Sequence, residues 1–170
     1  FDAVSGDLEF EYTLSHPVYV SEIDAGKYFY VSSGKTCYGF DLDKKTKIWD
    51  YHTDGFISSS PRKYRDSVYF GSWDGKIYAL KSSDGEYKWS YETGWGIDST
   101  PYVSDGRVFV GSLDNNFYCL DMYNGELIWY YSCKSAIHSN PVVYGDSVFF
   151  GCDDGILYAL DKENGAPVWG

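Results

Sequence analysis

The chain has 170 residues, 20% of them aromatic, and a formal net charge of −11 at neutral pH. This length is sufficient for one domain with a buried core, and the aromatic content suits strands, on whose pleated faces flat side chains pack. The acidic composition provides no basic stripe for phosphates, and no apolar run is long enough to span a bilayer. We therefore expect neither a nucleic-acid partner nor membrane insertion.

A repeat of 40 residues dominates the sequence. Tryptophans recur at this interval without insertion, as Trp49, Trp89, Trp129 and Trp169. A glycine stands four residues before the last three of them, as Gly85, Gly125 and Gly165. Repetition at a fixed interval predicts a tandem array of one supersecondary unit.

The first residues already belong to this repeat. Residues 1–6, ending in Gly6, have the spacing of the segment before each tryptophan, and Phe10 stands in the tryptophan position. We expect residues 1–14 to form a spare outer strand within a single domain over 1–170. The repeats that follow are expected over 15–49, 50–89, 90–129 and 130–170.

The third repeat illustrates the expected elements. Its short apolar segments occupy residues 97–103, 107–112, 116–121 and 126–131. Turn pairs separate them, at Asp105-Gly106, Asp114-Asn115 and Asn124-Gly125. This pattern predicts four short antiparallel strands, and no helix longer than one turn is expected anywhere. A repeated four-stranded sheet is typical of β-propeller blades, because stacking covers both faces of each sheet.

The sequence around the tryptophans resembles a known family. Ala159-Leu-Asp-Lys-Glu-Asn-Gly-Ala-Pro-Val-Trp169 is similar to the tryptophan-docking repeat of quinoprotein-like (PQQ-like) propellers, and the resemblance covers essentially the whole chain. It implies that each tryptophan packs between adjacent blades as a structural residue. The family includes pyrroloquinoline-quinone dehydrogenases, mostly eight-bladed, and non-enzymatic propellers such as the outer-membrane assembly lipoprotein. Lys45 in place of Gly, Glu22 in place of Pro and Lys81 in place of Asp depart from the pattern.

The ends of the chain allow several ways of completing the arrangement of blades. The sequence stops one residue after Trp169, whereas the second and third repeats continue past their tryptophans. The N-terminal strand could close a four-bladed ring, or complete a blade in another copy and give an eight-bladed dimer. It could also build a filament, since an open strand edge is a template for association. Alternatively, the chain is a fragment of an eight-bladed protein.

A central channel is the candidate location for a ligand. The innermost strands are expected at 57–61, 97–101 and 137–141, each ending in proline. Ser58, Asp98 and His138 occupy one position of the repeat in these strands. Ser60, Thr100 and Asn140 occupy another. These residues line a hydrated channel, or form a site for a small ligand or divalent cation with Asp98 as the anion and His138 as a titratable ligand.

Catalytic motifs are missing from the sequence. No two cysteines are adjacent, as they are against the quinone in the dehydrogenases of the resembling family, and no nucleophile–base order or phosphate loop occurs. We expect Cys37 and Cys119 to act as small core residues, and a disulfide between Cys133 and Cys152 is an open alternative. We expect no enzyme activity, cofactor or resident metal.

The sequence thus predicts a non-catalytic propeller scaffold, self-assembling through strand exchange between copies, in the extracellular space or cell envelope. The first alternative is an envelope module that binds a peptide or small ligand. Trp73, Trp95 and Tyr64 are its candidate anchors, because they are aromatic residues of turn regions outside the docking phase. The second alternative is a fragment of a quinone-dependent dehydrogenase.

Overall fold

A computed structural model describes residues 11–23 and 27–169 of the chain. They form four antiparallel sheets, each of four strands in chain order. The part of the chain so described contains no helix, and hence none that could cross a membrane. The expected all-β propeller fold with four-stranded antiparallel blades is therefore confirmed, and we call the sheets blades 1 to 4.

The strands are short. Blade 1 contains β1 (Val18–Ile23), β2 (Tyr28–Ser33), β3 (Thr36–Asp41) and β4 (Thr46–His52). Blade 2 contains β5 (Arg62–Tyr64), β6 (Ser67–Gly71), β7 (Lys76–Lys81) and β8 (Tyr87–Glu92). Blade 3 contains β9 (Tyr102–Ser104), β10 (Arg107–Gly111), β11 (Asn116–Asp121) and β12 (Leu127–Ser132). Blade 4 contains β13 (Val142–Tyr144), β14 (Ser147–Gly151), β15 (Leu157–Asp161) and β16 (Pro167–Trp169).

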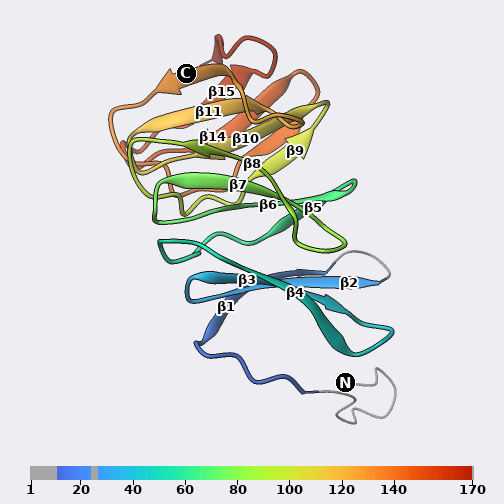
Figure 1. Ribbon diagram of the computed structural model, residues 1–170. Coiled ribbons are helices and arrows are strands. Elements are labelled where there is room, and N and C mark those ends of the chain that lie inside the picture. The colour runs from blue at the N-terminus through green and yellow to red at the C-terminus, as the bar shows by residue number, and fades with distance from the viewer. Residues whose placement is uncertain (1–10, 24–26, 170) are drawn as a thin grey trace, which may run out of the picture.

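The blades follow one another in a row. Blade 1, coloured blue, and blade 4, coloured orange to red, lie at its opposite ends (Figure 1). Strand β6 is buried along its whole length because it has a blade on either side. Val68 and Phe70 pack with Trp49 of blade 1, whereas Tyr69 packs with Val108 of blade 3. The four described blades thus form an open arc rather than a closed ring.

The tryptophans of blades 1 to 3 each reach the following blade. Their indole N–H groups donate to main-chain carbonyls at 3.0, 3.1 and 3.2 Å, in the pairs Trp49–Ser82, Trp89–Met122 and Trp129–Lys162. A small residue on the neighbouring strand makes room for each ring. Gly39 pairs with Trp49, and a Cβ atom on Gly39 would lie 2.3 Å from the indole.

The turn beneath each ring requires glycine for two reasons. Gly125 has a φ of 76°, a left-handed conformation that side chains disfavour, and a Cβ atom there would lie 2.5 Å from the ring of Trp89. Gly85 and Gly165 occupy the same position against Trp49 and Trp129. In the first repeat Lys45 adopts a φ of 53°, so the turn keeps its shape at the cost of strain.

The first repeat differs from the others in register. Glu22 pairs with Tyr30 as Arg62 pairs with Tyr69, so Glu22 takes the place of Arg62. The alignment of Glu22 with Pro61 is therefore wrong. Counted back from the tryptophans, Glu22 likewise coincides with Arg62, and Ser21 coincides with Pro61. The turn between β2 and β3 has two residues, whereas the turn between β6 and β7 has four. A change elsewhere in the first repeat compensates for this one, so the distance to the tryptophan is unaltered.

The innermost strands begin later than expected. Segments 57–61, 97–101 and 137–141 are irregular, and β5, β9 and β13 start directly after the prolines. Proline has no N–H group to donate to the neighbouring strand. In the segment before the proline, a serine side chain makes the hydrogen bonds to that strand instead. The Ser59 hydroxyl accepts from the Gly71 N–H at 2.7 Å and donates to its carbonyl at 2.9 Å, and Ser139 and Gly151 repeat this arrangement.

We expect Gly125→Ala to lower the free energy of unfolding by about 2–5 kcal/mol. About 1–2 kcal/mol comes from the left-handed backbone, and about 1–3 kcal/mol from displacing Trp89 out of its contact. Urea denaturation followed by tryptophan fluorescence measures the loss.

Gly155→Ala is the matched control, because Gly155 has a φ of 83° and no atom within 4 Å of a built Cβ. It should lose only the backbone contribution of about 1–2 kcal/mol. Equal losses in the two variants would show that the tryptophan contact contributes nothing.

Candidate functional site

The structure brings Ser58, Asp98 and His138 together, although they are 40 residues apart. Asp98 accepts a hydrogen bond from the Ser58 hydroxyl, and its other carboxylate oxygen lies 3.0 Å from Nδ1 of His138. Nε2 of His138 lies 3.4 Å from a carboxylate oxygen of Asp153, so the imidazole bridges two carboxylates. Trp73 joins the cluster by donating its indole N–H to Ser58 at 2.9 Å and to Asp98.

At the second polar position of the repeat, side chains accept hydrogen bonds from main-chain N–H groups. The hydroxyl of Thr100 accepts from the N–H of Ser60 at 3.0 Å, and the side-chain oxygen of Asn140 accepts from the N–H of Thr100 at 2.7 Å. These side chains satisfy the irregular segments of neighbouring blades, which is a structural role. Over the described residues, no three His, Cys, Asp or Glu side chains converge as metal ligands would.

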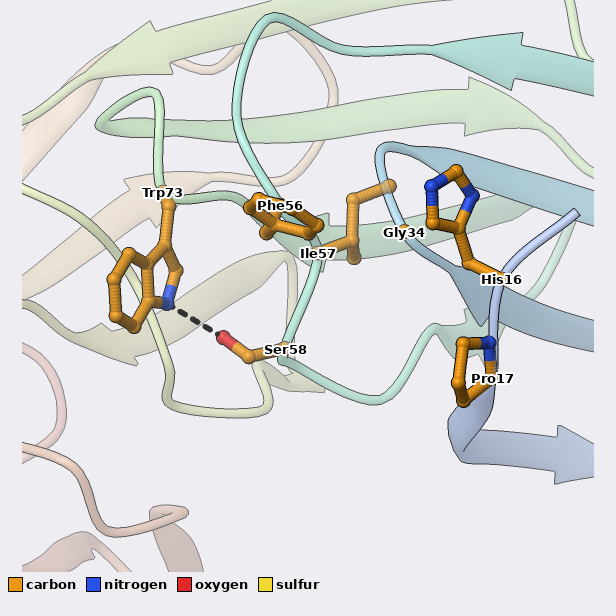
Figure 2. Close-up of a pocket in the computed structure, with 7 residues that line it drawn as sticks. All are labelled: His16, Pro17, Gly34, Phe56, Ile57, Ser58 and Trp73. Carbon is orange, nitrogen blue, oxygen red and sulfur yellow. Dashed lines mark hydrogen bonds between the residues drawn. The ribbon is translucent and has the colours of Figure 1, made fainter.

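A hollow of about 380 Å³ opens at the junction of blades 1 and 2. Figure 2 shows Trp73 and Phe56 on one side of it and His16 and Pro17 on the other. Gly34, Ile57 and Ser58 complete the lining. Most of these groups are apolar, and both aromatic side chains are more than half exposed. Exposed aromatic side chains around a concavity are typical of a binding site.

A second hollow, of about 180 Å³, adjoins the first because Trp73 lines both. Trp95, which is 69% exposed, and the acidic residues Asp74 and Glu92 also line it. Of the three aromatic anchors expected from the sequence, Trp73 and Trp95 therefore lie together. Tyr64 is half-buried and packs against the apolar cluster between blades 2 and 3.

A set of aspartates with a positioning role was not recognised in the sequence. Asp74 accepts hydrogen bonds from the Tyr78 hydroxyl at 2.9 Å and from the main-chain N–H of Asp54 at 3.1 Å. It therefore ties the β6–β7 turn to the preceding link between blades. Two further pairs, Asp114–Tyr118 and Asp154–Tyr158, repeat the contact at 2.7 Å. An aspartate with a tyrosine four residues later, recurring every 40 residues, is the signal that could have found them.

Burial and the aspartate bond raise the pKa of Tyr78, Tyr118 and Tyr158. The three hydroxyls stay protonated at physiological pH and remain donors. The hydrogen bond from Tyr78 thereby holds Asp74 in place, and Asp74 lines the second hollow.

Blade 4 exposes the face that the preceding blades bury. Leu157 is 56% exposed, whereas Ile77 and Phe117 at the same position are fully buried. Trp169 is 50% exposed, and its ring packs only beside Phe149, with centroids 6.0 Å apart. We call this surface the terminal face, and it comprises Val142, Tyr144, Phe149, Leu157 and Trp169. At the other end of the arc, Tyr12 and Leu14 cover Phe40 and Val31 of blade 1.

The remaining docking residue expected from the sequence, Phe10, lies outside the described residues. The other docking residues make the contacts described above, except that Trp169 has no turn of a following blade beneath it within residues 11–23 and 27–169.

Comparison with known proteins connects this geometry to a family. The family described as the outer membrane protein assembly factor BamB matches residues 1–169. The crystal structure of BamB from Moraxella catarrhalis is 25% identical, with a TM-score of 0.75, and the match covers 88% of this chain and 46% of that one. The chain thus spans about half the length of this relative. No protein of curated function matches the sequence.

Two more distant structures share the fold alone. The computationally designed Ika4 protein is 14% identical with a TM-score of 0.79, and the match covers 88% of this chain and 93% of that one. A europium-containing methanol dehydrogenase is 14% identical with a TM-score of 0.77, covering 85% of this chain and 40% of that one. The arc of four blades therefore occurs both as a whole chain and as part of a larger one.

The cysteines do not reproduce a quinone site. All four are free thiols, and the alternative of a disulfide between Cys133 and Cys152 is not realised. No adjacent cysteine pair exists in the sequence. The cysteines present therefore do not fit the contact with the quinone that the resemblance implies.

We expect Cys133 to resist alkylation in the folded protein. Burial, reinforced by the neighbouring Cys152, raises the pKa of its thiol to about 12, and only the thiolate reacts. Iodoacetamide at pH 8 should react about a thousand-fold more slowly than with an ordinary thiol, and tenfold faster with each pH unit above that. Peptide mapping by mass spectrometry follows each cysteine separately. The urea-unfolded chain is the control, and rapid alkylation of folded Cys133 at pH 8 would contradict the expectation.

Proposed function

Because the chain belongs to the family of the outer membrane protein assembly factor BamB, we propose that it is a non-catalytic propeller scaffold of the cell envelope. Its blades would bind protein partners, first of all other copies of the same chain. The family relation and the BamB structure support an envelope location and a protein-binding role. Assembly is the part of the proposal that the geometry of blade 4 supports.

The terminal face is the observation that carries self-association. Three of its apolar side chains, Phe149, Leu157 and Trp169, lie at positions that blades 1 to 3 bury against a following blade. Covering one large apolar side chain contributes about 1.5–3 kcal/mol, so a matching surface would be held firmly. Trp169 also has an indole N–H in the position from which Trp129 donates to Lys162.

A second copy of the chain supplies a matching segment. Asp2 and Gly6 have the spacing of Asp161 and Gly165, which form the turn that receives Trp129. The turns at Gly85, Gly125 and Gly165 each have their aromatic partner in the preceding repeat of the same chain. We therefore propose head-to-tail contact, with the terminal face of one copy against the N-terminal segment of the next. Residues 8–14 would be donated as a strand, for which Tyr12 and Leu14 would have to leave their contacts with blade 1.

The sequence left two other functions open, and each has its own test. The binding-module alternative is supported by the two hollows beside Trp73. A divalent cation between Asp98 and His138 would have only these two side chains as donors, and calorimetric titration with Zn²⁺ or Ca²⁺ tests it. The dehydrogenase alternative is supported only by the shared fold.

Self-association should depend on Leu157. We expect the wild-type chain to elute at a multiple of its 19.3 kDa mass at tens of micromolar, and Leu157→Lys to elute as a monomer. A charge at the centre of the terminal face would be desolvated without a partner. Size-exclusion chromatography with light scattering gives the mass, and Leu157 is exposed enough in the single chain for the variant to fold.

Val168→Lys is the matched control. Val168 neighbours Trp169 on β16 but points to the other side, and Lys88 occupies its position in blade 2. This variant should assemble as the wild type does. A wild-type mass of one chain at every concentration would overturn the self-association proposal, and equal loss in both variants would show that the terminal face is not the contact.

The proposed lack of catalysis predicts that added pyrroloquinoline quinone and Ca²⁺ produce no dye-linked oxidation of methanol. Equilibrium dialysis of the quinone should likewise show no saturable binding, because the sequence has no adjacent cysteine pair to lie against it. A measurable turnover with these additions would support the dehydrogenase fragment instead.

A further inference from the structure

We propose that the two hollows flanking Trp73 form one site for an extended peptide that carries an apolar side chain and, two residues later, a basic one. This site lies at the links and turns between blades, away from the terminal face, and goes beyond self-association. Successive side chains on one side of an extended peptide are two residues apart. Two hollows that share a wall match such a pair of side chains.

The first hollow suits an apolar side chain. Phe56, Ile57, Pro17 and Trp73 supply its walls, and its volume of about 380 Å³ admits a leucine or phenylalanine. Phe56 and Trp73 are exposed while the hollow is empty, so covering them removes apolar surface from water. Aromatic side chains at the centre of an interface contribute most of the binding energy.

The wall between the hollows is already fixed in position. The Trp73 indole donates to Ser58 and Asp98, and its main-chain N–H donates to the Phe56 carbonyl at 2.8 Å. His138 holds Asp98 from the other side. A ligand therefore does not have to order this side chain, which lowers the entropic cost of binding. This gives the polar cluster of Ser58, Asp98 and His138 a positioning role.

The second hollow suits a cation. Asp74 and Glu92 line it together with Trp73 and Trp95, and no basic side chain is in the lining. Asp74 already accepts several hydrogen bonds, so Glu92 is the carboxylate available to an ammonium or guanidinium group. The net charge of −11 favours a basic partner at long range.

The test uses the peptide acetyl-Gly-Leu-Gly-Lys-Gly-amide, titrated into the full chain with indole N–H signals followed by NMR. We expect saturable shifts of the Trp73 and Trp95 signals with a dissociation constant near or below about 1 mM. Replacing Leu by Ser, or Lys by Glu, in the peptide should each weaken binding at least about tenfold.

Variants of the protein separate this site from a general affinity for peptides. Trp95→Ala and Glu92→Gln should each weaken binding about tenfold, and Glu92→Gln should reduce its dependence on salt. Tyr123→Ala, which removes an exposed aromatic side chain that lines neither hollow and does not belong to the terminal face, should leave it unchanged. No saturable shift up to about 5 mM, or equal binding of the Lys-to-Glu peptide, would overturn the proposal. The failure of self-association would leave this result untouched, since the two surfaces share no residue.

Discussion

The contact between one indole and the turn of the next blade holds the arc together. Trp89 donates its N–H to the Met122 carbonyl while its ring lies on Gly125, so a single side chain fixes both the distance and the rotation of two sheets. Ala79 opposite the ring and Gly125 beneath it are small because the indole occupies their space. The same arrangement joins every neighbouring pair of described blades, and the rest of the core fills in behind it.

The regular core and the irregular links have different tasks. The middle strands of blades 1 to 3 are mostly buried on both faces and carry almost no polar side chains that could serve a ligand. The links and the β6–β7 type turns instead present Trp73, Trp95 and Asp98 on one side of the arc. Asp74 and its counterparts clamp these turns to the links, so a surface made of loops is held by hydrogen bonds instead of by packing.

The sequence predicted the blades because a 40-residue period with turn pairs between apolar runs leaves few other folds. It also predicted that Ser58, Asp98 and His138 share a place in the repeat. It could not predict the hollow at Trp73, which depends on the path of links without periodicity. The position of Glu22, by contrast, follows from the 40-residue period, which places it with Arg62. The exposure of Leu157 could not be predicted either, since a position in a repeat does not show whether a neighbouring blade covers it.

Contacts in this molecule run within a blade and, at the junctions, between consecutive blades. A whole unit could therefore be added or removed by duplication or deletion of 40 codons, and each remaining unit would still find the surface it needs. Lys45 shows that even the docking turn tolerates drift once such a unit exists, because its backbone keeps the left-handed shape without glycine. The length of the arc is thus open to evolutionary change in whole steps, while the geometry of each junction stays constant.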